Sequence, residues 1–443
     1  MKVLKFGGTS VGSARRMKIV AEQICNNERK IVVLSAMAGT TNTLVEICDY
    51  LHKRNADGAR ETIASLESLY WSVIDELYDS DSYRQTARTA IKENFAQIRE
   101  CIKELFTTFD EKIILAQGEL ISTAMMNLYL QEQGINSILL PALDYMRINR
   151  HNEPDMGYIR KHLKQLLETN NNADIYITQG YICRNAYDEI DNLQRGGSDY
   201  SASLIGAAIG ADEIQIWTDI DGMHNNDPRY VKHTRPVRNL HFEEAAELGY
   251  FGAKILHPTC IQPAKQNNIP VRLLNTMDPQ AQGTYISNYV GNPKEQAIKA
   301  VAAKDNITAI KIKSGRKLLA HGFLRKVFEI FETYHTTIDM VTTSEVGVSV
   351  TIDNQRHLPE ILDSLRRYGT VMVDENMVII CIVGNLEWHN VGYVSQALMA
   401  LKEIPVRMVS YGGSNYNISF LVHQDDKIAA LQALNRVIFG IDD

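Results

Sequence analysis

The sequence predicts an α/β fold built on a mainly parallel sheet, followed by two smaller ferredoxin-like units. Short apolar strands alternate with helical patterns over residues 2–286. Two Gly-Gly loops, Gly7-Gly8 and Gly196-Gly197, each precede a helical pattern. Beyond residue 297 the pattern changes to βαββαβ. A chain of 443 residues has room for about three such domains.

Composition excludes several classes of protein. The net charge of −7 at pH 7 disfavours a nucleic-acid or membrane partner. The chain begins in a predicted strand without a signal peptide, and no apolar run reaches membrane-spanning length. Six scattered cysteines without a CxxC pattern indicate free thiols in a reducing compartment. We therefore expect a cytoplasmic protein.

The first predicted strand leads into a glycine turn. Val3, Leu4 and Phe6 are apolar and indicate a buried strand with Lys5 at its end. The turn Gly7-Gly8-Thr9-Ser10 comes next, before a helix, so backbone N–H groups and a helix N-terminus can bind a phosphate there. The pattern is neither a P-loop nor GxGxxG. A phosphate site and a plain strand-to-helix turn both remain open.

A second strand, Lys30–Ser35, completes a βαβ unit and predicts a parallel sheet. Its polar loop, Ala36–Asn42, opens another helix. Ligands of open α/β sheets bind where such loops follow the carboxyl ends of strands. Residues 43–110 follow a helical pattern and carry no recognisable chemistry.

The sheet is predicted to resume at residues 112–116, so that Glu119 would follow a strand at the start of a helix. The alternative role of Glu119 is a helix-start carboxylate that the helix dipole stabilises. Residues 136–140 and 174–180 are two further predicted strands.

The second Gly-Gly loop carries an arginine and an aspartate. Gly196 and Gly197 allow a close approach of backbone, and Ser198 or Asp199 can cap the following helix. Arg195 can bind a carboxylate or a phosphate through paired donors. The alternative to a binding site is a capped helix start beside a surface arginine. The presence of two Gly-Gly loops in one domain makes this alternative less favoured.

The strand at 213–218 runs into a polar loop, residues 219–229, whose spacing does not match an EF-hand. His224 and His257 are isolated in sequence, so we predict no structural metal site. A helix over 242–253 is followed by Lys254, for which an exposed surface position is the alternative role. Strands at 269–274 and 283–286 complete the first domain.

The C-terminal part reads as two copies of a βαββαβ unit. The first has strands at 308–312, 337–343, 346–352 and 370–373 and helices at 324–334 and 357–368. The second begins at 377–383 and lacks its last strand, which residues 297–302 can supply. We predict a first domain over 1–287, a linker over 288–297, an inserted unit over 307–374 and a split unit over 298–306 and 375–443.

Together these motifs resemble the aspartate kinases (aspartokinases) of the amino-acid kinase family. The motifs occur in the order of that family: Lys5–Val11, Gly118-Glu119, Arg195–Asp199, Trp217–Asp219 with Asp227–Arg229, and Gly252–Pro258. The tail, Gly322–Leu324 with Val341–Glu345, resembles its paired ACT domains. The resemblance covers nearly the whole chain. It implies the amino-acid-kinase fold plus two ACT units, in a monofunctional enzyme without a homoserine dehydrogenase domain.

The resemblance implies transfer of the ATP γ-phosphoryl group to the side-chain carboxylate of L-aspartate, giving 4-phospho-L-aspartate and ADP. This reaction is the first step of lysine, threonine and methionine biosynthesis, and of diaminopimelate biosynthesis. Mg²⁺ would accompany ATP. Catalysis of such a transfer is mostly alignment and charge neutralisation, so no nucleophilic side chain is needed.

The resemblance also assigns roles to residues at the nucleotide. Lys5 would bind the transferring phosphoryl group, Lys254 would lie near the nucleotide phosphates, and Asp199 would orient these lysines and the Mg²⁺-bound phosphates. The implied ATP-binding set is Lys5, Phe6, Gly7, Gly8, Thr218, Asp219, His224, Arg229, Lys254 and Ile255. The family usually has a tyrosine where this chain has His224.

For the substrate, Arg195 would bind the α-carboxylate of aspartate and Glu119 its ammonium group. The other implied substrate residues are Thr41, Gly196, Gly197 and Ser198. The family usually has a glycine where this chain has Gln194. Neither departure removes a charged catalytic group.

The ACT resemblance implies feedback inhibition by an amino acid, lysine in the first place and threonine in the second. The expected effector residues are Phe323, Leu324, Ile338, Asp339, Ser344 and Glu345. Lys317 and Ala320 replace residues that often contact lysine in lysine-sensitive relatives. We expect a homodimer or higher homo-oligomer through the ACT units, and the alternative is a dimerisation module without a ligand.

The same residues disfavour two other functions. A glutamate kinase is disfavoured by the pairing of Glu119 with Arg195 and by the tandem ACT tail. A ligand-binding regulator with an inactive kinase domain is disfavoured because the charged residues predicted for catalysis are retained.

Overall fold

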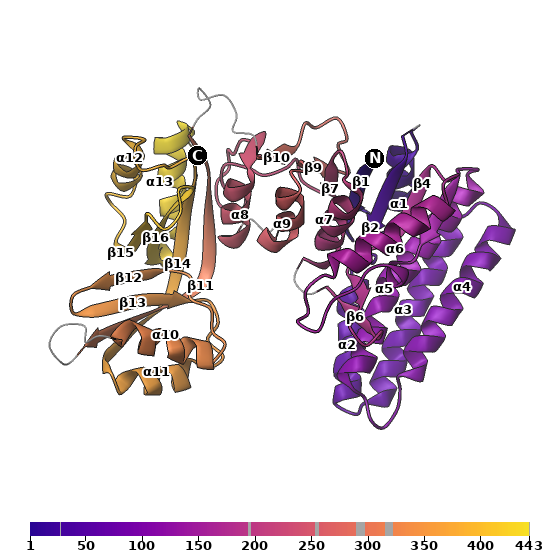
Figure 1. Ribbon diagram of the computed structural model, residues 1–443, viewed down its shortest axis with the longest axis horizontal. Coiled ribbons are helices and arrows are strands. Elements are labelled where there is room, and N and C mark those ends of the chain that lie inside the picture. The colour runs from indigo at the N-terminus through magenta and orange to yellow at the C-terminus, as the bar shows by residue number, and fades with distance from the viewer. Residues whose placement is uncertain (27, 194–195, 253–256, 289–296, 315–321, 443) are drawn as a thin grey trace. The chain divides into compact units, whose positions relative to one another are not determined.

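The computed structural model of the chain describes residues 1–26, 28–193, 196–252, 257–288, 297–314 and 322–442 (Figure 1). The chain divides into two units. The first unit comprises Met1–Met223, Arg238–Phe242 and Ile255–Val290. The second unit comprises His224–Val237, Glu243–Lys254 and Gly291–Asp443. Two segments that precede residue 255 in sequence therefore pack with the C-terminal part.

An eight-stranded sheet forms the centre of the first unit, in the order β3-β4-β2-β1-β7-β9-β10-β8. Neighbouring strands are parallel except β9 and β10. The strands are β1 Lys2–Phe6, β2 Lys30–Leu34, β3 Ser137–Leu140, β4 Ile175–Gln179, β7 Ile214–Thr218, β8 Asn239–His241, β9 Val271–Asn275 and β10 Thr284–Ser287. The carboxyl ends of β1, β2, β4 and β7 therefore share one edge, as the sequence predicts.

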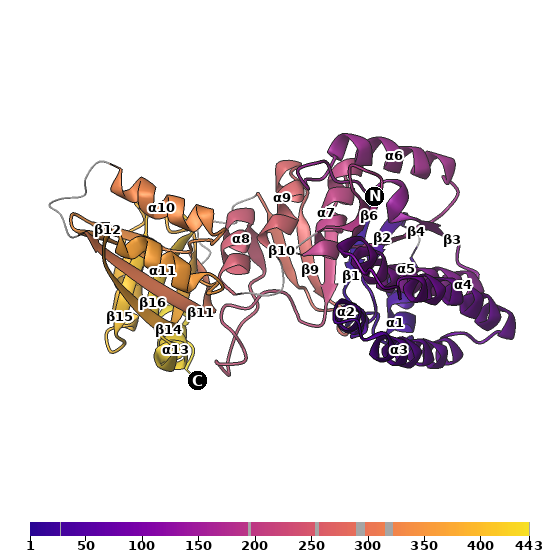
Figure 2. The same ribbon diagram turned by 90° about the horizontal axis from the view of Figure 1, so that it is seen from below.

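Helices cover both faces of this sheet (Figure 2). On one side lie α1 Ala14–Ile24, α2 Thr40–His52, α3 Ala56–Leu77, α4 Asp81–Glu100 and α5 Thr108–Glu132. Helices α2 to α5 pack side by side (Figure 1). On the other side lie α6 Met156–Thr169, α7 Gly197–Ile209 and α9 Pro258–Gln266. A short hairpin of β5 Ile182–Arg184 and β6 Ile190–Asn192, which the sequence analysis missed, and the 3₁₀ turn Ala142–Asp144 complete the unit.

The predicted strand at 112–116 is wrong, because these residues belong to helix α5. The helix begins at a capping box in which Thr107 and Asp110 satisfy each other's backbone N–H groups. Residues 114–119 are all buried, so their apolar run has the composition of a buried strand as well as of a buried helix.

Helix α5 is also, among the residues that the structure describes, the one helix long and apolar enough to span a membrane by length and composition. The sequence analysis expected no such segment. In the folded chain 78% of the apolar window is buried inside the protein, as in the core helix of a globular domain.

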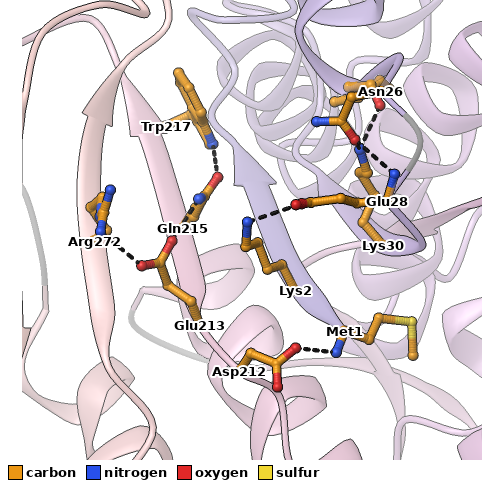
Figure 3. Close-up of polar contacts among 11 residues, drawn as sticks. Met1, Lys2, Asn26, Glu28, Lys30, Asp212, Glu213, Gln215, Trp217 and Arg272 are labelled. Carbon is orange, nitrogen blue, oxygen red and sulfur yellow. Dashed lines mark hydrogen bonds and ion pairs between the residues drawn. The ribbon is translucent and has the colours of Figure 1, made fainter.

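Ion pairs line the opposite, amino-terminal edge of the sheet (Figure 3). The amino group of Met1 pairs with Asp212, and Nζ of Lys2 lies 2.9 Å from Oε2 of Glu28. A hollow of about 500 Å³ on this edge is lined by Met1, Lys2, Glu28, Arg29 and Asp212. Because the charges of four of these residues pair with one another, we place no functional site there.

The second unit contains a six-stranded antiparallel sheet in the order β12-β13-β11-β14-β16-β15. The strands are β11 Ile298–Ser314, β12 Val341–Ser344, β13 Gly347–Ile352, β14 Gly369–Gly384, β15 Val406–Tyr411 and β16 Asn417–His423. The helices are α8 Phe242–Tyr250, of which Phe242 belongs to the first unit, α10 Phe323–Thr333, α11 Leu358–Arg366, α12 Tyr393–Ala400 and α13 Lys427–Phe439, with a 3₁₀ turn at Gln424–Asp426.

Strands β11 and β14 are long and shared by both halves of this sheet. Residues 298–304 of β11 pair with 379–384 of β14, and residues 309–314 pair with 369–374. Strands predicted separately at 297–302 and 308–312 thus run on as one strand, as do those predicted at 370–373 and 377–383. Two apolar cores result, one under α10 and α11 and one under α12 and α13. The predicted domain bounds stay a prediction.

Candidate active site

An ion pair marks the carboxyl end of β1. Nζ of Lys5 lies 2.7 Å from Oδ1 of Asp199, and the two side chains are only 12% and 16% exposed. Lys5 comes from β1, while Asp199 lies in the first turn of α7, where the helix dipole favours a carboxylate. The two charged residues that the sequence analysis placed at this edge from distant motifs are therefore in contact.

The first glycine turn lies against the end of β7. The rings of Phe6 and Trp217 stack with centroids 5.6 Å apart, and the amide of Gly7 donates to the carbonyl of Trp217 at 3.4 Å. Thr218 ends β7, and the following residue, Asp219, is exposed. The predicted nucleotide residues of β1 and β7 thus lie side by side.

The second glycine turn enters α7 through Gly196, whose φ of +78° is in the left-handed region. A Cβ at Gly196 would also collide with Sγ of Cys260, so a side chain is excluded twice. The next helical residue but one, Ser198, packs against Gly180, which lies just after β4. A Cβ at Gly180 would collide with Oγ of Ser198. The loop therefore brings Ser198 and Asp199 to the ends of β4 and β1.

Glu119 reaches the same edge from the middle of α5, not from a strand end. It is 5% exposed, and its Oε1 accepts a hydrogen bond from the amide of Ala36 at 3.3 Å. The preceding residue is Gly118, and a Cβ at this position would collide with the Cβ of Ala36. The absence of a side chain lets α5 approach the loop after β2 closely. Burial raises the pKa of Glu119 to about 7, although the Ala36 hydrogen bond and the charge of Lys5 act in the opposite direction.

Buried hydrogen bonds next to Glu119 fix α5 on the sheet. Oγ of Ser122 donates to the carbonyl of Ser35 at 2.8 Å. Nε2 of Gln179, the last residue of β4, donates to Oγ1 of Thr123 at 2.8 Å. These residues carry no signal in the sequence, because Ser, Thr and Gln at such positions are equally common on exposed surfaces.

Tyr181 is a further residue without a sequence signal. Its φ of +66° is unusual for an aromatic residue, and its ring would collide with a Cβ at Gly197. Its amide donates to Oγ of Ser201 at 2.9 Å. Strained backbone of this kind is concentrated at functional sites, which agrees with the position of Tyr181 at the carboxyl end of β4.

The remaining predicted site residues are distributed differently. Thr41 is exposed in the first turn of α2, after the β2 loop. Arg195, Lys254 and Ile255 lie outside the described residues. His224 and Arg229 belong to the second unit.

Within the second unit, both of these nucleotide candidates have polar partners. Nδ1 of His224 lies 2.7 Å from Oγ1 of Thr234. The guanidinium of Arg229 binds both carboxylate oxygens of Asp227, with Nε 2.9 Å from Oδ1.

The predicted effector residue Asp339 lies in a buried charged cluster. Its Oδ1 is 2.7 Å from Nζ of Lys304 and 2.9 Å from the hydroxyl of Tyr250. Lys304 also pairs with Asp353 at 2.9 Å. Oδ2 of Asp339 is buried without a hydrogen-bond partner. Burial raises the pKa of Asp339, and the contacts with Lys304 and Tyr250 offset part of that effect.

The other expected effector residues surround α10 and β12. Phe323 and Leu324 start α10, and Phe323 is buried while Leu324 is half-buried. Ile338 is half-buried, and Ser344 and Glu345 are exposed at the β12–β13 turn.

Comparison with known proteins gives the family. The model of the amino acid kinase family matches residues 1–275, and an ACT-domain model matches residues 380–438. Aspartokinase 1 of Arabidopsis thaliana, a chloroplastic protein, is 33% identical over an alignment covering all of this chain and 80% of the relative. Lysine-sensitive aspartokinase 3 of Escherichia coli is 31% identical over 99% of both chains.

The chain belongs to the aspartokinase family. The crystal structure of Escherichia coli aspartokinase III in complex with aspartate and ADP matches 99% of this chain with a TM-score of 0.86 and 31% identity, and all of that chain is covered. The predicted α/β amino-acid-kinase fold with a C-terminal ACT region is confirmed. The predicted enzyme class, a phosphotransferase with a carboxyl group as acceptor, is confirmed for this aspartokinase as well.

Proposed function

We propose that the chain transfers the γ-phosphoryl group of ATP to the side-chain carboxylate of L-aspartate, with release of ADP. The observation that carries the proposal is the contact of Lys5 with Asp199 at the sheet edge that Glu119 also reaches. A lysine and two carboxylates at one sheet edge suit a site where an anionic phosphoryl group and an ammonium-bearing substrate meet. The product would be the first intermediate of lysine, threonine and methionine biosynthesis, formed in the cytoplasm.

The transfer needs charge neutralisation more than covalent chemistry. A carboxylate oxygen of aspartate attacks the γ-phosphorus, and the bond to the oxygen bridging the β- and γ-phosphates breaks. Lys5 binds the phosphoryl oxygens as this charge redistributes, and Asp199 orients the ammonium group of Lys5 through the 2.7 Å contact. The low exposure of both side chains strengthens these interactions.

At the substrate, Glu119 binds the ammonium group of aspartate and Arg195 its α-carboxylate, with Thr41 and Ser198 beside them. Burial raises the pKa of Glu119, and the positive charge of the bound substrate would favour its ionised form. Thr218, Asp219, His224, Arg229 and Lys254 contact the nucleotide.

Mg²⁺ is proposed to enter with ATP. Among the residues that the structure describes, no three His, Cys, Asp or Glu side chains gather in a group able to hold a metal ion. Mg²⁺ usually binds through substrate phosphates and one or two carboxylates. Asp199 is the carboxylate that would share it, and the ion would neutralise phosphate charge.

An assay that traps the acyl phosphate with hydroxylamine tests the proposed reaction. Purified protein with ATP and Mg²⁺ should form a hydroxamate from L-aspartate in the presence of hydroxylamine, and little or none from L-glutamate. Failure to form aspartyl hydroxamate would refute the proposal. Glutamyl hydroxamate alone would identify a glutamate kinase, and ADP binding without either product would identify a regulator with an inactive kinase domain.

We propose that the second unit mediates feedback inhibition by lysine. The Escherichia coli relative is named for its sensitivity to lysine. In this chain the buried Oδ2 of Asp339, which lacks a hydrogen-bond partner, is suited to accept from the ammonium group of an amino acid. Phe323, Leu324 and Ile338 would contact the effector's carbon chain, and Ser344 and Glu345 its polar ends.

Lysine titration should therefore inhibit the reaction, and Asp339→Asn should weaken inhibition by at least about tenfold, because it removes a charge-assisted hydrogen bond. Asp353→Asn is the control, since Asp353 also pairs with Lys304 but has a more exposed side chain. Inhibition by threonine alone would assign the second effector. If neither amino acid inhibits, regulation by lysine or threonine is excluded.

The proposed oligomer is a homodimer or higher homo-oligomer formed through the ACT units. Strands β12 and β15 are the two edges of the second sheet. Exposed apolar side chains lie on both edges, among them Val341, Val409 and Tyr411. Such edges favour pairing with another chain. We propose the predicted division into an inserted unit over 307–374 and a split unit over 298–306 and 375–443 as the architecture that presents them.

A further inference from the structure

The loop His224–Val237, called here the nucleotide loop, connects two strands of the first unit but packs as part of the second. It contains His224 and Arg229, both predicted to bind ATP. Val231 is fully buried in the core of the second unit together with Ile298, Phe420 and Leu434. A side chain of this size, buried among residues of the ACT region, contributes about 2 kcal/mol of hydrophobic stabilisation and places the loop in that core.

Three buried asparagines make hydrogen bonds that fix how the loop packs. Asn225, Asn226 and Asn435 are 4%, 2% and 1% exposed. Nδ2 of Asn226 donates to the carbonyl of Leu431 at 3.1 Å, and Nδ2 of Asn225 lies 3.3 Å from Oδ1 of Asn435. Leu431 and Asn435 are both on α13, the last helix of the chain. A buried amide that loses such partners is costly, so these contacts determine one position of the loop.

Asn435 binds the nucleotide loop at a second point. Its Nδ2 donates to the carbonyl of His233 at 3.3 Å and to that of Ile441 at 3.1 Å. The loop is also closed on itself, because the amide of Asn225 donates to the carbonyl of Arg235 at 2.9 Å. The loop therefore rests on α13 as one preformed piece.

The charged side chain of Lys427 contacts the middle of the nucleotide loop. Nζ of Lys427, the first residue of α13, lies 3.9 Å from the ring centroid of Tyr230 and 2.8 Å from Oδ2 of Asp305. Tyr230 directly follows Arg229, whose guanidinium is held by Asp227. The predicted ATP-binding arginine is thus oriented from both sides by residues of the second unit.

The base of the same loop is fixed in the first unit. Both terminal guanidinium nitrogens of Arg238 lie 3.0 Å from carboxylate oxygens of Asp221, and the amide of Met223 donates to Oγ1 of Thr284 at 2.8 Å. Strand β7 ends at Thr218, only a few residues before Asp221 and Met223, which make these contacts. The residues that flank the loop on both sides thus belong to the first unit, while the loop itself belongs to the second.

We infer that Asn226 and Asn435 are positioning residues for the nucleotide. They hold the loop on α13, so the affinity for ATP depends on the C-terminal helix even though that helix is not assigned to the nucleotide site. The inference rests on the proposed function, because it takes His224 and Arg229 as nucleotide contacts.

Asn226→Ala and Asn435→Ala test the inference in the full chain. Each should raise KM for ATP and Kd for ADP about tenfold, the effect of losing a buried hydrogen bond that holds the loop. KM for aspartate and kcat at saturating ATP should stay within about twofold, because the interaction positions nucleotide alone. Gln396→Ala is the matched control, since Nε2 of Gln396 donates to a carbonyl of the same helix, that of Val437, at 3.1 Å without touching the loop.

ADP affinity measured by calorimetry without aspartate separates the outcomes. Folded variants that keep wild-type affinity for ADP overturn the inference, as does an equal loss in Gln396→Ala. A fall in melting temperature with unchanged affinity would mean a purely structural role. If Asn435→Ala does not fold, Asn226→Ala decides alone. A wild-type chain that binds ADP but makes no acyl phosphate would refute the proposed function and leave the inference testable by affinity.

Discussion

Replacing Lys5 with alanine should lower kcat by about three orders of magnitude, while the affinities for ADP and aspartate change by only a few-fold. The reason is the position of its Nζ, 2.7 Å from Asp199 at the carboxyl end of β1. An ammonium group there can follow the charge that develops on the transferring phosphoryl oxygens. The measurements are initial rates at saturating substrates and ADP calorimetry. An unchanged kcat would exclude Lys5 from the transition state.

Lys2→Ala is the matched control for Lys5→Ala. Lys2 lies on the same strand and also pairs with a carboxylate, Glu28 at 2.9 Å, but at the amino end of β1 (Figure 3). Its loss should leave kcat unchanged and cost little stability, because an exposed ion pair contributes little. Equal losses of kcat in the two variants would point to damage to β1 in place of a catalytic role.

Glu119→Gln should lower kcat/KM for aspartate about 100-fold, because a buried charge-assisted hydrogen bond to the substrate ammonium is lost. In the unmodified chain kcat/KM for aspartate should fall as the pH drops below about 7, since Glu119 must be ionised to bind that group. The variant should lack this inflection. A pH profile that is the same in both proteins would remove Glu119 from substrate binding.

The same substitution predicts a stability effect of defined sign. The pKa of Glu119 is raised in the folded chain from 4.5 to about 7, so the folded state holds the proton more tightly than the unfolded state. Its favourable contribution is complete below the unfolded pKa and is lost as the pH rises through about 7. Above that pH, Glu119→Gln should be the more stable protein by up to about 3 kcal/mol.

Glu111→Gln is the control for both effects. Glu111 is on the same helix, but its carboxylate lies on the surface, 3.1 Å from Nε2 of His52. Thermal unfolding should show a stability difference between this variant and the unmodified chain that does not change with pH. A pH-dependent difference in both variants would mean that the whole helix, and not the buried carboxylate, responds to pH.

Much of the sheet edge could be predicted because its signals are local. A short apolar strand, a Gly-Gly turn and a helix pattern recur in sequence, and parallel strands bring such turns to one edge. Lys5 and Asp199 are far apart in the chain, yet each lies beside one of these turns. Their contact follows from topology, which alternation of strands and helices already defines.

The position of Glu119 could not be predicted in the same way. An apolar run such as residues 113–116 is buried in either a strand or a helix, and burial removes the amphipathic period that distinguishes them. The capping box at Thr107 was the available signal for a helix that starts earlier. The sequence thus predicts Glu119 at the correct edge of the sheet, but it predicts a strand where the structure has helix α5.

Other features depend on contacts that no local pattern encodes. Asn225 and Asn226 read as loop residues, and Asn435 as a polar residue of a surface helix. All three are buried because segments more than 200 residues apart pack together. A single sequence carries no periodic signal for such a contact.

The long shared strands β11 and β14 have a consequence for how the C-terminal region unfolds. Each strand contributes residues to both halves of one sheet, although the ladder between the halves is irregular, with exposed residues at 305–306 and 375–376. Opening one half therefore frays the strands on which the other half is built. Any ligand that stabilises one half therefore raises the cost of opening in the other, with no change of shape required between them.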